Sequence, residues 1–202
     1  MQSMFGASAL SAFKSSKLLH SMRGACSSID SLHARFVHFV DCEDNFSVLD
    51  SPQLASLLSY GELGEPQFPG DQVILSRLVV PRPGTISPWS SKATDIIHNC
   101  GISTVNRIER GILFSIGIKK ELEAEQVKSV DQFLYDKMTQ VVLDEIKDAA
   151  MLFMSAKPTP MQAISIANGK KTLTSANDSM GLALAQDEID YLFERFTELG
   201  RN

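Results

Sequence analysis

The amino-acid sequence predicts an α+β fold, a two-layer α/β sandwich in which helices cover one face of a sheet, followed by a mainly helical segment. Up to about residue 143, stretches with apolar side chains at every second position alternate with stretches at helical spacing. Pro158 and Pro160 then interrupt any regular element and favour an extended linker. Helical spacing returns only near the end of the chain. We therefore expect two domains, residues 1–155 and residues 156–202.

The first 29 residues have two interpretations. They hold three basic residues, many serines and no acidic residue before Asp30, a composition typical of an organellar transit peptide. Leu10, Phe13 and Met22, however, recur at helical spacing, which predicts a helix packed on the domain. We favour the folded helix.

A strand and a helix follow. Residues Ala34–Asp41 are rich in aromatic and β-branched side chains and predict a strand. Ser51 and Pro52 mark the start of a short helix that reaches Tyr60, because Ser caps helices and Pro suits the first turn. The three glycines and two prolines of Gly61–Gly70 predict a loop.

The second strand is predicted over Val73–Val80, ended by Pro81. Ser87 is placed to cap a helix that Gly101 terminates. One apolar stripe along this helix predicts that it packs lengthwise on the sheet. The stripe consists of Trp89, Ala93, Ile96, Ile97 and Cys100.

Four further elements complete the pattern. Arg107–Ile118 alternates like a strand, Glu123–Tyr135 predicts a helix, and Met138–Leu143 predicts a fourth, short strand. Asp187–Leu199 predicts an amphipathic helix with acidic residues at its positive end. Because the chain stops just past this helix, we expect the natural protein to continue beyond Asn202.

Composition excludes several classes of protein. A net charge of −5 with evenly mixed signs argues against a nucleic-acid surface. The longest apolar runs are far shorter than the roughly 20 residues that cross a bilayer, so we expect no membrane segment. Three widely spaced cysteines indicate reduced thiols.

The residues that could carry chemistry are not spaced for it. His33 and His38 are predicted to point to opposite faces of one strand and cannot share a metal ion. Cys100 at a helix C-terminus is disfavoured as a nucleophile, and we expect it in the core. Asn168–Thr172 lacks the first glycine of a phosphate loop and predicts a turn. We therefore expect no catalytic residue and no metal site.

The loop between the second strand and its helix is the best candidate for a binding site. A helix start of this kind offers free N–H groups and attracts anions. Alternatively, Ser87 only caps the helix, Trp89 fills the core and Lys92 is solvated. The candidate residues are Arg82, Thr85, Ser87, Ser90, Ser91 and Lys92.

The same loop carries a resemblance to a known family. PRPGTISPWSSKATDIIHNCG at residues 81–101, followed by RIERG, closely resembles the N-terminal domain of phosphoribosylformylglycinamidine synthase of the large single-chain PurL type. Residues 9–13 resemble the opening of that family, and GLAL at 181–184 with DEIDYL at 187–192 resembles its linker domain. The resemblance implies a PurS-like domain at 1–155 and the start of the linker at 156–202.

The resemblance also implies a function. The family uses ATP, magnesium and ammonia from glutamine to convert formylglycinamide ribonucleotide to its amidine in purine biosynthesis, and it is cytoplasmic. This chain ends before the synthetase motif and the glutaminase residues, so it is expected to be an inactive fragment of the enzyme. Its expected role is assembly with the synthetase and glutaminase domains, with Arg82–Lys92 as an interdomain contact. The alternative is a free-standing PurS-like subunit or small-ligand binding module.

Overall fold

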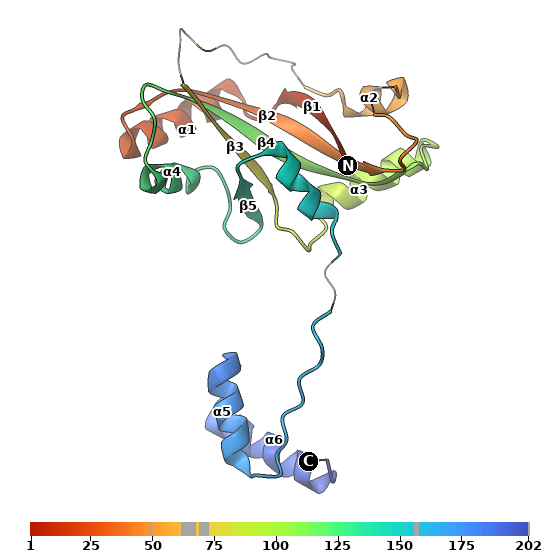
Figure 1. Cartoon of the computed structure of the whole chain (residues 1–202), viewed down its shortest axis with the longest axis vertical. Helices are drawn as coiled ribbons and strands as arrows, with labels where there is room; N and C mark the ends of the chain where they lie inside the picture. The colour runs from red at the N-terminus through yellow and green to blue at the C-terminus, as the bar shows by residue number, and fades with distance from the viewer. Residues whose placement is uncertain (49, 62–67, 69–72, 156–157, 202) are drawn as a thin grey trace. The chain divides into compact units, whose positions relative to one another are not determined.

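The computed structural model describes residues 1–48, 50–61, 68, 73–155 and 158–201. They belong to two compact units, Met1–Ala156 and Lys157–Asn202. The strands of the first unit are β1 (Gln2–Ser8), β2 (Ile29–Cys42), β3 (Val73–Pro81), β4 (Val105–Ile118) and β5 (Gln140–Leu143). Its helices are α1 (Ala12–Ala25), α2 (Pro52–Leu58), α3 (Pro88–Asn99), α4 (Ala124–Asp131) and the 3-10 helix η1 (Ile146–Phe153). Figure 1 shows both units.

The sheet is antiparallel throughout, with strand order β1-β2-β4-β3-β5. This confirms the predicted α+β fold. The long strands β2 and β4 are both 14 residues, and they pair in the centre of the sheet. Phe36 and Ile112 occupy the same position in their strands, since each is the eighth residue. These two residues are also cross-strand partners. A pseudo-twofold axis therefore passes between them, and β1-α1-β2-α2 repeats as β3-α3-β4-α4.

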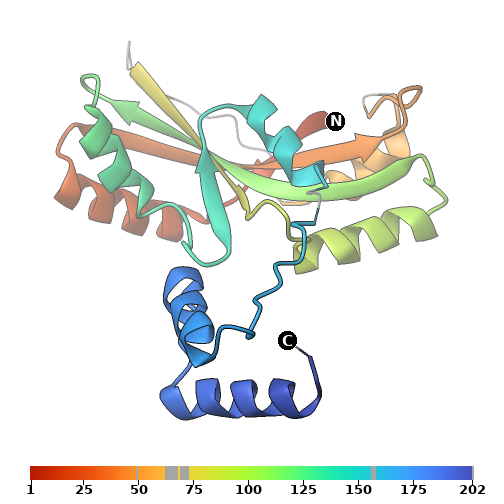
Figure 2. The same cartoon turned by 60° about the horizontal axis from the view of Figure 1, so that its bottom comes forward.

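Helices α1 to α4 cover one face of the sheet. At one end of this face, α1 and α4 pack on a core that includes Met22, Phe114 and Val130. At the other end, α2 and α3 pack on a second core with Leu54 and Ile97. Side chains alternate along each strand, so the neighbouring residues form a third core on the opposite face under η1. Figure 2 shows α1 and α4 under one end of the sheet, α3 under the other, and η1 on the far side.

The two long helices begin in the same way. Ser11 caps α1 by accepting the Lys14 backbone N–H, and Ser87 caps α3 by accepting the Ser90 backbone N–H. A second serine then ties each helix to the sheet. Ser15 donates its hydroxyl to the Leu32 carbonyl, and Ser90 donates its hydroxyl to the Ile108 carbonyl. The repeat thus extends from topology to individual hydrogen bonds.

The predicted strands and helices of the first unit all form. The strand predicted over Ala34–Asp41 is β2, and it starts earlier than expected, at Ile29. The helix predicted up to Tyr135 is α4, and it ends at Asp131. The loop predicted over Gly61–Gly70 lies, apart from Gly61 and Phe68, outside the described residues. Two elements, β1 and η1, had no sequence prediction.

The predicted apolar stripe of α3 is wrong at two positions. Cys100 is exposed and Ile96 is 45% exposed, whereas both were expected in the core. The helix presents Ser90 and Thr94 to the sheet instead, because the Ser90 hydroxyl donates to the Ile108 carbonyl and the Thr94 hydroxyl accepts the Ile108 N–H. The side of α3 that meets the sheet therefore contains Ser90 and Thr94, and Ile96 and Cys100 lie outside it.

The second unit is a helical hairpin of α5 (Lys170–Met180) and α6 (Gln186–Glu198). The Asn177 side chain donates to the Leu184 carbonyl at 3.3 Å and accepts the Leu184 N–H at 2.8 Å, which fixes the connection between the helices. Lys170 forms an ion pair with Asp190 across the hairpin at 3.0 Å. Helix α6 was predicted to within one residue at each end, and α5 was not predicted.

Candidate interaction site

Hydrogen bonds fix the loop that connects β3 to α3. Arg82 donates its backbone N–H to the Thr139 carbonyl at 2.9 Å, which ties the loop to the turn before β5. Thr85 donates its backbone N–H at 3.3 Å and its hydroxyl at 2.6 Å to the Arg82 carbonyl. Gly84 lies inside this turn at φ +83°, a conformation that favours glycine. The loop therefore has one defined shape.

A pocket of about 570 Å³ lies between this loop and the turn before β5. Arg82, Thr85 and Ser87 line one side, so the structure brings three of the six candidate residues together. The pocket also carries two exposed apolar side chains, Ile86 at 58% and Met138 at 78%. An exposed cation beside exposed apolar groups is typical of a surface that meets another protein surface.

The start of α3 already holds a carboxylate. Ser87 donates its backbone N–H at 3.2 Å and its hydroxyl at 2.8 Å to the two carboxylate oxygens of Glu109. Glu109 is fully buried on β4. The positive end of the helix dipole stabilises this acid, and the acid in turn positions the helix start. At Ser87, the donors expected to attract an external anion are therefore used within the fold.

The other three candidate residues follow one another in α3 but have different surroundings. Ser90 is buried and holds α3 on β4 through the Ile108 carbonyl. Ser91 is exposed, with its hydroxyl 3.5 Å from the Ser87 carbonyl. Lys92 is exposed and lines a different pocket, between α2 and α3. Ser87 and Ser90 thus maintain the fold, while Arg82, Thr85, Ser91 and Lys92 face outward.

A polar cluster that the sequence did not predict lies between β2, β4, α2 and α3. Arg110 donates to the Tyr60 hydroxyl at 3.0 Å, and that hydroxyl lies 2.7 Å from His38 Nε2. The Arg110 guanidinium also stacks on Phe36 at 4.3 Å and on Trp89 at 4.7 Å from the ring centroids. Burial, and then the charge of Arg110, lower the pKa of His38 to about 4. The ring is therefore neutral at pH 7, and its Nε2 shares a hydrogen bond with the Tyr60 hydroxyl.

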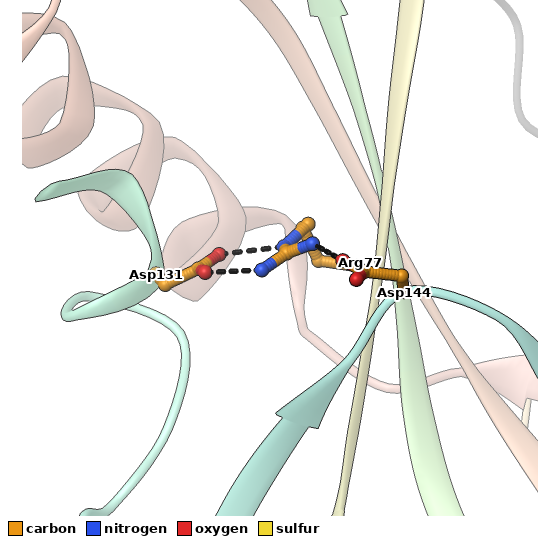
Figure 3. Close-up of polar contacts among 3 residues, drawn as sticks. All are labelled: Arg77, Asp131 and Asp144. Atoms are coloured by element: carbon orange, nitrogen blue, oxygen red, sulfur yellow. Dashed lines mark hydrogen bonds and ion pairs between the residues drawn. The ribbon is translucent and has the colours of Figure 1, made fainter. Parts of the chain in front are cut away.

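A second cluster lies at the other end of the same face. Arg77 on β3 binds Asp131 of α4 through two guanidinium nitrogens and Asp144, after β5, through the third (Figure 3). The Arg77 and Asp131 side chains are 12% and 13% exposed, whereas Asp144 is 79% exposed. Hydrogen bonding to Asp131 is the largest cause that raises the pKa of Arg77 above its ordinary value. Arg77 thus joins α4, β3 and β5.

Only one of these clusters left a signal in the sequence. Arg77 interrupts the apolar run Val73–Val80, and a charge inside such a strand indicates a buried partner. Its partner Asp131 lies in a helix far along the chain. His38 and Arg110 are cross-strand partners, and their proximity depends on the register of β2 with β4, which no local pattern encodes.

Within the described residues, no three His, Cys, Asp or Glu side chains gather where they could hold a metal ion. The helices of the described part of the chain include none that is long and apolar enough to cross a membrane.

The first unit is thus an α+β sandwich with an internal repeat. The loop between β3 and α3 faces outward, and the buried carboxylate of Glu109 binds its last residue, Ser87. The family model for the N-terminal region of formylglycinamide ribonucleotide amidotransferase matches residues 35–153, more than half of the chain. The chain belongs to this family, which is an amidotransferase family of purine biosynthesis. The match begins within β2 and ends at the last residue of η1.

Proposed function

We propose that this chain is the N-terminal module of a complete formylglycinamide ribonucleotide amidotransferase and that it serves assembly and coupling between the catalytic domains. The complete enzyme would use ATP, magnesium and glutamine-derived ammonia to convert formylglycinamide ribonucleotide to its amidine. Residues 1–202 would then be a fragment that is inactive by itself and acts in the cytoplasm with synthetase and glutaminase domains.

One observation carries this proposal: the buried polar groups of the candidate site maintain the fold, while its cations remain on the surface. Ser87 is engaged by Glu109, and Ser90 by the backbone of β4. Among the described residues, neither Arg82 nor Lys92 takes part in an ion pair. An exposed cation on a hydrogen-bonded loop, Arg82, and another on the helix that follows, Lys92, suit contact with an acidic surface of another domain.

The six candidate residues divide between two roles under this proposal. Ser87 and Ser90 position α3, whereas Arg82, Thr85, Ser91 and Lys92 contact a neighbouring domain. Arg82 is the most informative to change, because it lines the pocket beside Ile86 and Met138 and makes its intramolecular hydrogen bond through the backbone. Removing its side chain should leave the loop folded.

The test is Arg82→Ala in the complete amidotransferase. We expect glutamine-dependent turnover to fall about tenfold through misplaced domains, while turnover with added ammonia stays near that of the unchanged enzyme. Steady-state rates with each nitrogen source measure this. Equal loss with both sources, or no loss with glutamine, would contradict a coupling role. The matched control is Lys128→Ala, an exposed cation on α4 that does not line the pocket at Arg82.

A further inference from the structure

A small apolar pocket lies between α2 and α3, apart from the loop at Arg82. It has a volume of about 170 Å³, and most of its lining comes from Leu57, Leu58, Trp89, Ala93 and Ile97. Ile96 also lines it and is 45% exposed. Apolar cavities of roughly 150 Å³ hold a benzene-sized group, so this pocket admits one aromatic or branched aliphatic side chain.

The internal repeat supplies a comparison. Helices α1 and α4, the counterparts of α3 and α2, contact each other directly, and Met22 and Val130 are fully buried between them and the sheet. The groove between those two helices is filled by the chain's own side chains. Between α2 and α3 the equivalent place is open. The two ends of this sheet face therefore differ in chemistry: the pocket between α2 and α3 is mostly apolar, whereas the pocket beside α4 is lined by Arg77, Asp131 and other polar side chains.

The charge beside the pocket indicates what accompanies that side chain. Lys92 lines the pocket and is exposed. Asp95, three residues further on the same helix, makes no ion pair with it. Arg110, the next cation in this region, lies behind Trp89 and Tyr60. Lys92 is therefore the cation that lines the pocket, no carboxylate of the described residues pairs with it, and an acidic group from another surface complements it.

We propose that the α2–α3 pocket receives one apolar side chain, flanked by a carboxylate, from another domain of the amidotransferase. The apolar side chain fills the space between Leu57 and Ala93, and the carboxylate pairs with Lys92. Such a pairing of a buried apolar anchor and a peripheral ion pair is typical of interface contacts. This inference rests on the proposed function, because it requires the remaining domains of that enzyme.

Hydroxyl-radical footprinting of the complete amidotransferase and of the 202-residue chain tests the proposal. We expect oxidation of Leu57 and Ile96 to fall at least about threefold in the complete enzyme, because interface cores exclude water. Two variants of the complete enzyme sharpen the result. Lys92→Glu reverses the charge beside the pocket and Ala93→Leu fills it, and each should restore oxidation of Ile96. Lys128→Glu, an exposed lysine on α4, is the matched control and should change nothing at the pocket.

Each outcome is decisive. Equal oxidation in the two proteins would overturn the proposal, since nothing then covers the pocket. Protection that survives both Lys92→Glu and Ala93→Leu would also overturn it, because the cover would then be neither charge-paired nor inserted. Circular dichroism of the variants checks that they are folded. Failure here leaves the role of Arg82 intact, because coupling is measured separately by the ratio of glutamine- to ammonia-dependent turnover.

Discussion

The two halves of the first unit share one topology but place their polar residues differently. At the position where the first half has His38, the second has Phe114, and where the first has Arg35, the second has Gly111. Both ends of the helix-covered face have an apolar core, but beside one lies the Arg77 ion cluster and beside the other a neutral histidine, His38. Repetition of the hydrophobic pattern therefore determines the fold, while single polar substitutions make the halves distinct.

The ion cluster provides the largest expected effect. Asp131→Ala leaves the Arg77 guanidinium, 12% exposed, with only the exposed Asp144 as a carboxylate partner. Removing one partner of a buried ion pair should lower the free energy of unfolding by about 4 kcal/mol, measured by urea denaturation. Asp144→Ala is the control and should cost under about 1 kcal/mol, because its side chain is solvated. Equal effects of the two changes would show that Asp131 is not the main partner.

In the other half, His38 makes the stability of the fold depend on pH. The pKa of His38 lies at about 4 in the folded chain, against 6.5 for an ordinary histidine. The unfolded ring gains a proton as pH falls below about 6.5 while the folded ring, beside Arg110, stays neutral. Stability is therefore complete above pH 6.5 and should decline by roughly 3 kcal/mol as pH falls to 4.

His38→Phe, which introduces the residue found at the equivalent position 114, isolates this effect. The variant should lose less stability than the unchanged chain between pH 7 and pH 4, by roughly 2 to 3 kcal/mol. Urea denaturation at both pH values gives the difference, and any constant cost of losing the hydrogen bond to Tyr60 cancels from it. Parallel pH profiles would mean that His38 titrates as it does in water.

Local sequence signals predicted the parts of the fold that local chemistry determines. Ser51-Pro52, Ser87-Pro88 and Gly101 marked helix ends correctly, because capping depends on neighbouring residues only. β1 was missed since QSMFGAS has no β-branched residue, and its pairing with β2 makes it a strand.

In the candidate site, too, contacts between distant parts of the chain could not be predicted from local sequence. Ser87 was predicted as a cap, but its partner Glu109 comes from the next strand, and only tertiary contact reveals it. The burial of Ser90 in place of Cys100 has the same origin, since a hydrogen bond to Ile108 outweighs the apolar pattern of the helix.

Gly111 sharpens the comparison at the centre of the sheet. A Cβ atom there would lie 2.8 Å from the Val79 carbonyl oxygen and 3.0 Å from Val80 Cγ1. In the first half, the equivalent Arg35 has room to lie over the Phe5 ring, 3.6 Å from its centroid. Gly111→Ala should therefore lower the free energy of unfolding by about 2 kcal/mol, because the backbone of β3 cannot easily move.

Gly24 in α1 gives the smallest effect, with the opposite sign. A Cβ atom at Gly24 meets nothing within 4 Å, and its φ is not in the left-handed region. Gly24→Ala should raise the free energy of unfolding by about 0.5 to 1 kcal/mol, because alanine loses less backbone entropy in a helix. Urea denaturation of this variant beside Gly111→Ala compares the same substitution at two sites. If both changes were destabilising, helix propensity would not control the last turn of α1, and packing that involves neighbouring Met22 would have to explain the loss.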